Sequence, residues 1–168
     1  AITVIGDTKK RNISSRNFAK DGYILAVSGE FGSSGQGLYE LKKGLKESYF
    51  INYHKHPVLN KEISNEIALN TSCPYAMMDS SDGLIDCIYQ ISNKSKVKIN
   101  IEYDLIPKKT DNRDFVLYGG EDYSLVVAIH PNDFKKIKGL IKIGNCTSGS
   151  GIYLDGKKIE YKGYNHFE

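Results

Sequence analysis

Two aspartates flank two serines where an apolar segment gives way to a helical repeat, in the stretch AMMDSSDGL (76–84). Asp82 is well placed as a helix N-cap, because its carboxylate can accept a hydrogen bond from an amide that lacks a partner in the first turn. Alternatively, Asp79 and Asp82 supply the hard oxygen ligands that Mg²⁺ requires, beside a helix N-terminus that favours bound phosphate. The residues alone leave a capped turn and a metal–phosphate site equally favoured.

A second acidic cluster is GGEDY (119–123). Its two glycines allow the backbone to adopt unusual dihedral angles and to approach a ligand closely. Glu121 and Asp122 point to opposite faces if a strand has begun here, because side chains alternate along a strand. A tight turn with two solvated acids fits the spacing equally well.

The segment GEFGSSGQG (29–37) is rich in glycine but matches neither the P-loop nor the G-x-G-x-x-G dinucleotide pattern. Its amides, ahead of a helix, can still bind an anion. A flexible turn that feeds the helix is the favoured interpretation of this segment.

The histidines and cysteines are weaker candidates for chemistry. His54 and His56 flank a lysine, and no further ligands can be placed around them, so we expect surface histidines rather than a metal site. Cys73, Cys87 and Cys146 are odd in number and have no close pair. This usage favours small buried side chains in a reducing cytoplasm over a disulfide framework or a zinc site.

The elements that must position these residues alternate between strands and helices. Apolar runs and alternation predict strands at 2–5, 23–27, 76–79, 97–103, 125–129 and 140–143, and a hairpin around 155–156. Helical spacing predicts helices at 38–48, 60–67 and 84–91 and one that begins at 131. Residues 53–57 are expected to form a turn or extended connector, and residues 104–116 a loop with a short helical turn. Because the order follows no strict β-α-β rhythm, we expect one α/β (α+β) domain in which helices cover a mixed β-sheet.

Composition limits the function classes. The 168 residues suffice for one domain with a buried core. The net charge of +3, from 23 basic and 20 acidic residues, is too weak to indicate a nucleic-acid partner. No apolar stretch is long enough to span a membrane, and the N-terminus has no signal-peptide pattern. The chain opens directly on a strand-like ITVIG, from which we expect a fragment of a longer protein.

Several motifs together resemble one family. DSSDGL (79–84) followed by YGGEDYSL (118–125) closely resembles the C-terminal domain of thiamine-monophosphate kinases, within the ATP-binding superfamily of aminoimidazole ribonucleotide synthetase. The segments ISSRNFAKDGYILAVSGEFGSSGQGL and GIYLDGKKIEYKGYNHF resemble further family segments in the same order. The sequence departs from the family at 54–57, where an arginine-rich segment is usual, and at Asn17 and Phe18, where a small residue and glycine are common. These departures leave the local loop geometry open.

The resemblance implies a site for ATP and Mg²⁺. By position, Asp79 and Asp82 match magnesium ligands, Ser81 matches a residue that contacts ATP, and Arg16 matches a residue that binds the nucleotide phosphates. The implied reaction transfers the γ-phosphoryl group of ATP to thiamine monophosphate. Such transfer needs positioning and charge neutralisation, so the lack of an obvious nucleophile or catalytic base is expected.

The resemblance also implies a substrate site and partners. Glu121 matches a residue that binds the thiamine part of the substrate, and Tyr164 matches an aromatic residue that packs against it. In the family an N-terminal domain supplies further magnesium ligands, much of the nucleotide site and a homodimer interface, so this chain alone is expected to lack kinase activity. The alternatives are a non-catalytic homologue that binds a nucleotide or another subunit, or a superfamily member of hydrogenase maturation or selenophosphate synthesis.

Overall fold

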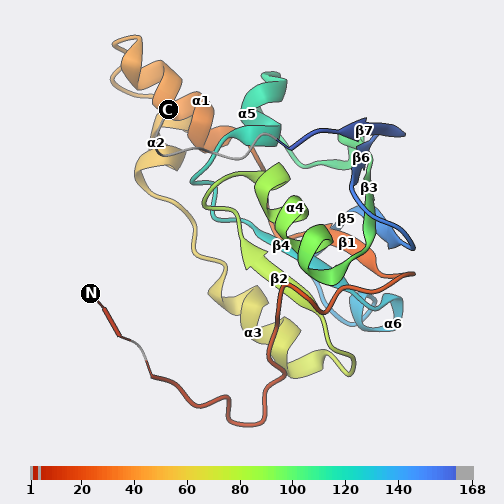
Figure 1. Ribbon diagram of the computed structural model, residues 1–168. Coiled ribbons are helices and arrows are strands. Elements are labelled where there is room, and N and C mark those ends of the chain that lie inside the picture. The colour runs from red at the N-terminus through yellow and green to blue at the C-terminus, as the bar shows by residue number, and fades with distance from the viewer. Residues whose placement is uncertain (1, 4, 162–168) are drawn as a thin grey trace.

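A computed structural model describes residues 2–3 and 5–161. Figure 1 shows the elements, which are, in chain order, β1 (Ile24–Val27), α1 (Ser33–Lys42), α2 (Tyr49–Lys55), α3 (Lys61–Asn70), β2 (Ala76–Asp79), α4 (Leu84–Ser95), β3 (Lys98–Ile101), the 3₁₀ turn η1 (Tyr103–Leu105), α5 (Arg113–Tyr118), β4 (Leu125–Ile129), α6 (Pro131–Phe134), β5 (Ile141–Thr147), β6 (Ile152–Leu154) and β7 (Lys157–Ile159).

The strands form one mixed sheet in the order β2-β4-β1-β5-β3-β6-β7. The β3–β6 pair is parallel and the other neighbouring strands are antiparallel. The expected fold class, a single domain with a mixed sheet covered by helices, is confirmed.

Both faces of the sheet are covered where β4 runs through it, which explains why LVVAI is apolar without alternation. Val126 and Ala128 belong to one core cluster, against the apolar stripe of α4. Val127 and Ile129 belong to a second cluster, which includes Ile67 of α3. Figure 1 shows α4 and α3 lying on different parts of the sheet. Within the described residues, no helix has the length and apolar character needed to cross a bilayer.

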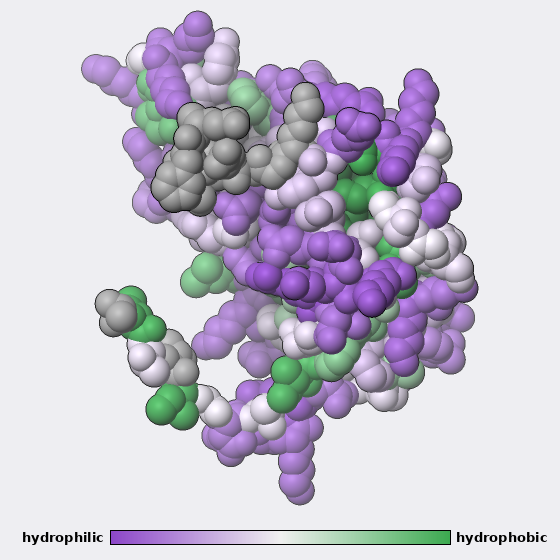
Figure 2. Space-filling view, viewed as in Figure 1, coloured by the Kyte–Doolittle hydropathy of each residue, from purple (hydrophilic) through white to green (hydrophobic). Residues whose placement is uncertain are grey.

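Three expectations about the elements were wrong. Ile2 and Ile5 are 94% and 93% exposed and the described residues around them form no strand, because no other strand pairs with them. The N-terminal segment stands clear of the body of the molecule, whose visible face in Figure 2 is largely hydrophilic.

The other two concern the helices around the glycine-rich segment. Helix α1 begins at Ser33, inside that segment, and ends at Lys42, just before Gly44 takes a φ of +89°. The expected connector at 53–57 is helical through Lys55, because Ser48 caps α2 by accepting a hydrogen bond from the Ile51 amide at 3.0 Å.

Candidate functional site

The two acidic motifs meet because β2 and β4 pair antiparallel. Asp79, the last residue of β2, lies opposite Leu125, the first residue of β4. The GGEDY segment runs directly into β4, so it must pass beside the residues that follow β2. Two backbone hydrogen bonds fix this contact, from the Glu121 amide to the Ser81 carbonyl at 2.9 Å and from the Tyr123 amide to the Ser80 carbonyl at 3.3 Å.

The carboxylates of Asp79 and Asp82 are on the surface, and neither has the capping role that was one alternative. Helix α4 begins after Gly83, whose φ is 101°, and no side chain caps its N-terminus. The Asp82 carboxylate accepts a hydrogen bond only from the neighbouring Ser81 hydroxyl, at 3.2 Å, among the described residues. Of the two alternatives left open by the residues, the one in which Asp82 caps the helix is therefore wrong, and both carboxylates are open to a ligand.

Arg16 shares this region with the acids. The buried Cys87 thiol donates a hydrogen bond to the Asp79 carbonyl at 3.2 Å, and its pKa depends on the charges around it. Burial raises the pKa of Cys87, the carboxylates of Asp86, Asp79 and Asp82 raise it further, and the Arg16 guanidinium lowers it. Asp79, Asp82 and Arg16 thus lie near enough to one thiol to act on its pKa.

The segment around Arg16 is held by the last residue of α4. The Ser95 hydroxyl donates to the Arg16 carbonyl at 2.7 Å and accepts from the Ala19 amide at 3.0 Å. A cavity of about 520 Å³ opens beside it, lined by residues 14–17, Met77 and Lys94. Two cationic side chains on a polar cavity suit an anionic ligand. Among the described residues, no group of three or more potential metal-binding side chains is assembled.

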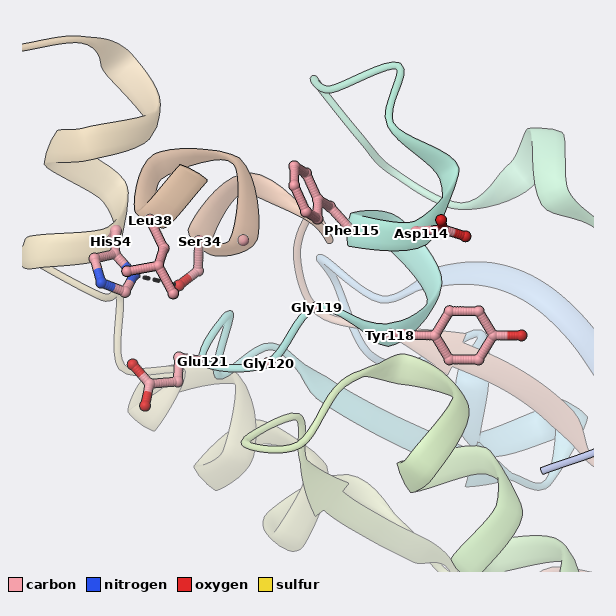
Figure 3. A pocket seen from close by; sticks show the side chains of 10 residues that line it. Ser34, Leu38, His54, Asp114, Phe115, Tyr118, Gly119, Gly120 and Glu121 are labelled. Atoms are coloured by element: carbon pink, nitrogen blue, oxygen red, sulfur yellow. Dashed lines mark hydrogen bonds between the residues drawn. The ribbon is translucent and has the colours of Figure 1, made fainter. Parts of the chain in front are cut away.

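The second cavity, of about 680 Å³, lies between α1, α2, α5 and the GGEDY segment (Figure 3). The residues that line it are Ser34, Gly35, Leu38, His54, Asp114, Phe115, Tyr118, Gly119, Gly120 and Glu121. In Figure 3, His54, Ser34 and Leu38 lie together, Phe115 lies across from them, and Glu121 lies at the edge of the cavity below His54. Asp114 and Tyr118 point away on the other side of α5.

The lining of this cavity suits a cationic ring system. Its described lining offers the Glu121 carboxylate and includes neither lysine nor arginine, whereas the Asp114 carboxylate points away. Leu38 and Phe115 offer apolar and aromatic surface, and an aromatic face attracts a cation. An apolar pocket with a few polar groups is the usual form of a small-molecule site.

His54 was expected to be a surface histidine, but it is partly buried and its Nδ1 lies 2.8 Å from the Ser34 Oγ. Sequence reasoning missed this pair, because Ser34 and His54 lie on different helices. Recognising that residues 53–55 continue a helix, rather than form a connector, would have suggested that His54 packs against a neighbouring element. Cys87 and Cys146 are buried, as expected.

Behind this cavity lies Asp122, which is 1% exposed. Its Oδ2 accepts from the Gly32 amide at 2.6 Å and its Oδ1 accepts from the Ser34 amide at 2.9 Å. GGEDY is therefore neither a strand nor a turn with two solvated acids, since Glu121 is exposed and Asp122 is buried. The glycine-rich amides do bind an anion, and that anion is a side chain of the same protein. Tyr164 lies outside the described residues.

The comparisons with known proteins agree with one another. No protein-family model matches the chain. The chain is 30% identical to "Thiamine-monophosphate kinase" of Aquifex aeolicus (strain VF5), over 99% of this chain and 58% of the relative. It is 33% identical to the protein of the same name from Buchnera aphidicola subsp. Schizaphis graminum, over 99% of this chain and 59% of the relative. The chain thus spans somewhat more than half the length of the curated relatives it matches.

Solved structures give the same result. The structure "AaThiL complexed with AMPPCP and TMP" superposes with a TM-score of 0.81 at 28% identity, covering 93% of this chain and 55% of that one. A structure of E. coli HypE, at 18% identity and a TM-score of 0.71, shares the fold. The family predicted from the motifs is confirmed.

Proposed function

Because the chain is a homologue of the thiamine-monophosphate kinases, we propose that it carries part of a site at which ATP phosphorylates thiamine monophosphate to thiamine diphosphate. One observation carries the proposal. The Glu121–Ser81 backbone hydrogen bond, at 2.9 Å, fixes the cavity that suits a cationic ring directly beside the carboxylates that suit Mg²⁺ and phosphate. A phosphate acceptor with a cationic ring would thereby face a bound nucleotide.

We assign the nucleotide and metal contacts to Asp79, Asp82, Ser81 and Arg16. The residues fit Mg²⁺, because this ion is commonly held by one or two carboxylates together with water and substrate phosphates, and both carboxylates are exposed. When bound, Mg²⁺ would neutralise charge on the phosphate oxygens. Arg16 would contact the phosphates directly, as guanidinium groups do, and Ser81 would hold the Asp82 carboxylate in place.

The substrate would enter the 680 Å³ cavity. The thiazolium ring of thiamine is an aromatic cation, so Glu121 would attract its charge and Phe115 would contact its face. Tyr164 remains a predicted contact of the same ring.

We also propose that this chain corresponds to the C-terminal domain of the relatives and that an N-terminal domain completes the site and forms a homodimer. The coverage of 58% of the Aquifex relative supports a second domain. The described residues gather no set of three metal ligands, which supports a shared site. The chain alone is then expected to bind ATP weakly and to release ADP far more slowly than the complete kinase. A coupled assay that shows such a rate would refute this division.

The direct test measures thiamine diphosphate formation by a protein that joins these residues to the N-terminal domain. Asp79→Asn removes one charge at the strand end, and we expect at least a 100-fold lower turnover, because fewer ligands neutralise the transferring group. Asp104→Asn, at an exposed aspartate on η1, is the control and should keep full activity. Undiminished activity of Asp79→Asn would remove the metal role of that residue.

A further inference from the structure

Helix α1 lacks a cap from its own sequence. Its N-cap residue is Gly32, no local side chain caps it, and its first turn contains no acidic residue. Four backbone amides at a helix N-terminus need partners, and the helix dipole favours negative charge there. The carboxylate of Asp122, which lies 88 residues after Ser34, supplies two hydrogen-bond acceptors and a negative charge at this N-terminus.

Little space is left for any other arrangement around Gly32. Its φ is 85°, and a Cβ there would lie 2.8 Å from the Val116 amide nitrogen of α5 and 2.9 Å from the Thr110 Cγ2. The N-terminus of α1 is thus wedged against α5, and Gly35 of the same helix borders the ring of Phe115. The position of α1 defines one wall of the cavity.

The opposite wall is strained. Glu121 has a φ of 63° and Tyr123 a φ of 54°, so the residues on both sides of Asp122 adopt the left-handed conformation. This conformation is unfavourable for residues other than glycine and persists only where the surrounding structure imposes it. Asp122 is the residue between them, and its carboxylate is held by α1 on one side while the Glu121 and Tyr123 amides bond to Ser81 and Ser80 on the other.

We propose that Asp122 is a positioning residue for the binding site, because its two hydrogen bonds to the start of α1 hold Glu121 at the edge of the cavity and Ser34 against His54. The ligand would be the cationic ring of thiamine monophosphate, so the inference rests on the proposed function. Asp122 touches no substrate atom. It ties the α1 wall to the strained GGEDY wall, and the two walls lose their relative position when it is replaced.

The electrostatic environment agrees with this geometry. The pKa of Asp122 is raised to about 6, because burial and, to a smaller extent, the Glu30 carboxylate raise it more than the Ser34 and Gly32 amides lower it. Tyr53 is also near, since its hydroxyl lies 3.5 Å from the Asp122 carbonyl, and the titratable residues His54 and Glu121 line the adjoining cavity.

The test compares Asp122→Asn with Asp133→Asn in this 168-residue chain. Asp133 is equally buried and also accepts two backbone hydrogen bonds, from Ser72 and Cys73, but it lies away from the cavity. Thiamine monophosphate is titrated calorimetrically into each protein at a temperature where both are folded. We expect at least tenfold weaker binding for Asp122→Asn and unchanged binding for Asp133→Asn. Equal affinity of Asp122→Asn and the unsubstituted chain would overturn the inference.

Failure of the unsubstituted chain to bind thiamine monophosphate would count against the proposed function instead. Amide hydrogen exchange then tests the positioning role without a ligand. Asp122→Asn should increase exchange at Glu121 and Tyr123 as well as at Gly32 and Ser34. If exchange increases only at Gly32 and Ser34, Asp122 caps the helix and positions nothing.

The unsubstituted chain provides a further check if Asp122→Asn does not fold. Amide chemical shifts are followed from pH 4 to 8 in this chain and in His54→Gln, which removes the neighbouring imidazole. A single shared midpoint at Gly32, Ser34 and Glu121 in both proteins supports the coupling. A Glu121 amide that does not follow the other two overturns it.

Discussion

Asp122 and Asp133 are buried aspartates in two different regions of the molecule. Each is 1% exposed, and each accepts hydrogen bonds from two backbone amides of a distant segment. Asp133 also has a cation, because the Lys136 Nζ lies 2.7 Å from its Oδ1. Among the described residues, Asp122 has no such partner, and the nearby charge that acts on its pKa is the carboxylate of Glu30.

The pKa values move in opposite directions as a result. For Asp133, burial acts to raise the pKa, but the Lys136 hydrogen bond and the Cys73 and Ser72 amides outweigh it, so the pKa is lowered. For Asp122, burial dominates and the pKa is raised to about 6. Removing one partner of the Asp133–Lys136 pair is destabilising, because the other charge is left uncompensated. Asp122 combines burial, a raised pKa and a place beside a cavity, which makes it a candidate for a functional role.

The largest effect on stability should come from Asp133→Ala. The change leaves the Ser72 and Cys73 amides without their acceptor and Lys136 without its partner. We expect the free energy of unfolding to fall by about 4 kcal/mol, since a hydrogen bond to a charged group contributes about 1.5–3 kcal/mol and two backbone amides lose theirs. Urea denaturation measures it, and a loss below about 1 kcal/mol would contradict the structural role.

The pH dependence of Asp122 should come next. Its folded pKa of about 6 lies above the ordinary 3.8, so its contribution is fully present below pH 3.8 and is lost as the pH rises through 6. The free energy of unfolding should therefore fall by up to about 3 kcal/mol across that range, relative to Asp122→Asn. Urea denaturation at a series of pH values measures the difference, and a rise over the same range would mean that the sign is wrong. Asp133 should show the opposite trend, with stability lost as the pH falls.

A smaller loss is expected for Gly32→Ala. The φ of 85° is unfavourable for alanine, and its Cβ would meet the α5 backbone at 2.8 Å. We expect about 2 kcal/mol of destabilisation, seen as a lower thermal midpoint. Gly22→Ala is a matched control, because its φ is 81° but nothing lies within 4 Å of an added Cβ. Equal losses in the two variants would show that backbone conformation alone is responsible.

The smallest effect, and the one that most sharpens the comparison, is that of Lys136→Met. Lys136 is half exposed, so its removal should lower stability by only about 1 kcal/mol. The pKa of Asp133 should then rise, because burial is no longer opposed by the cation. NMR titration of the Asp133 carboxyl measures this shift. An unmoved pKa would show that the two amides suffice.

Local patterns predicted the parts of this fold that depend on neighbours in sequence. The apolar stripe of α4, the alternation of β3 and the apolar run of β4 were all found, because each pattern lies within a single helix or strand. Ile2–Ile5 shows the limit, because a strand-like segment forms no strand without a partner. The candidate residues Asp79 and Glu121 were found from motifs, whereas the hydrogen bonds of Asp122 were not. Its partners lie about 90 residues away, and the antiparallel β1–β4 pairing brings the two segments together.

The most direct test of the account is calorimetric titration of thiamine monophosphate into the 168-residue chain and into Glu121→Gln. The substitution keeps the shape of the side chain and removes the negative charge at the edge of the cavity. The account predicts that the unsubstituted chain binds and that Glu121→Gln binds at least tenfold more weakly. Equal affinities in the two proteins would contradict the claim that this cavity receives the cationic ring of the substrate.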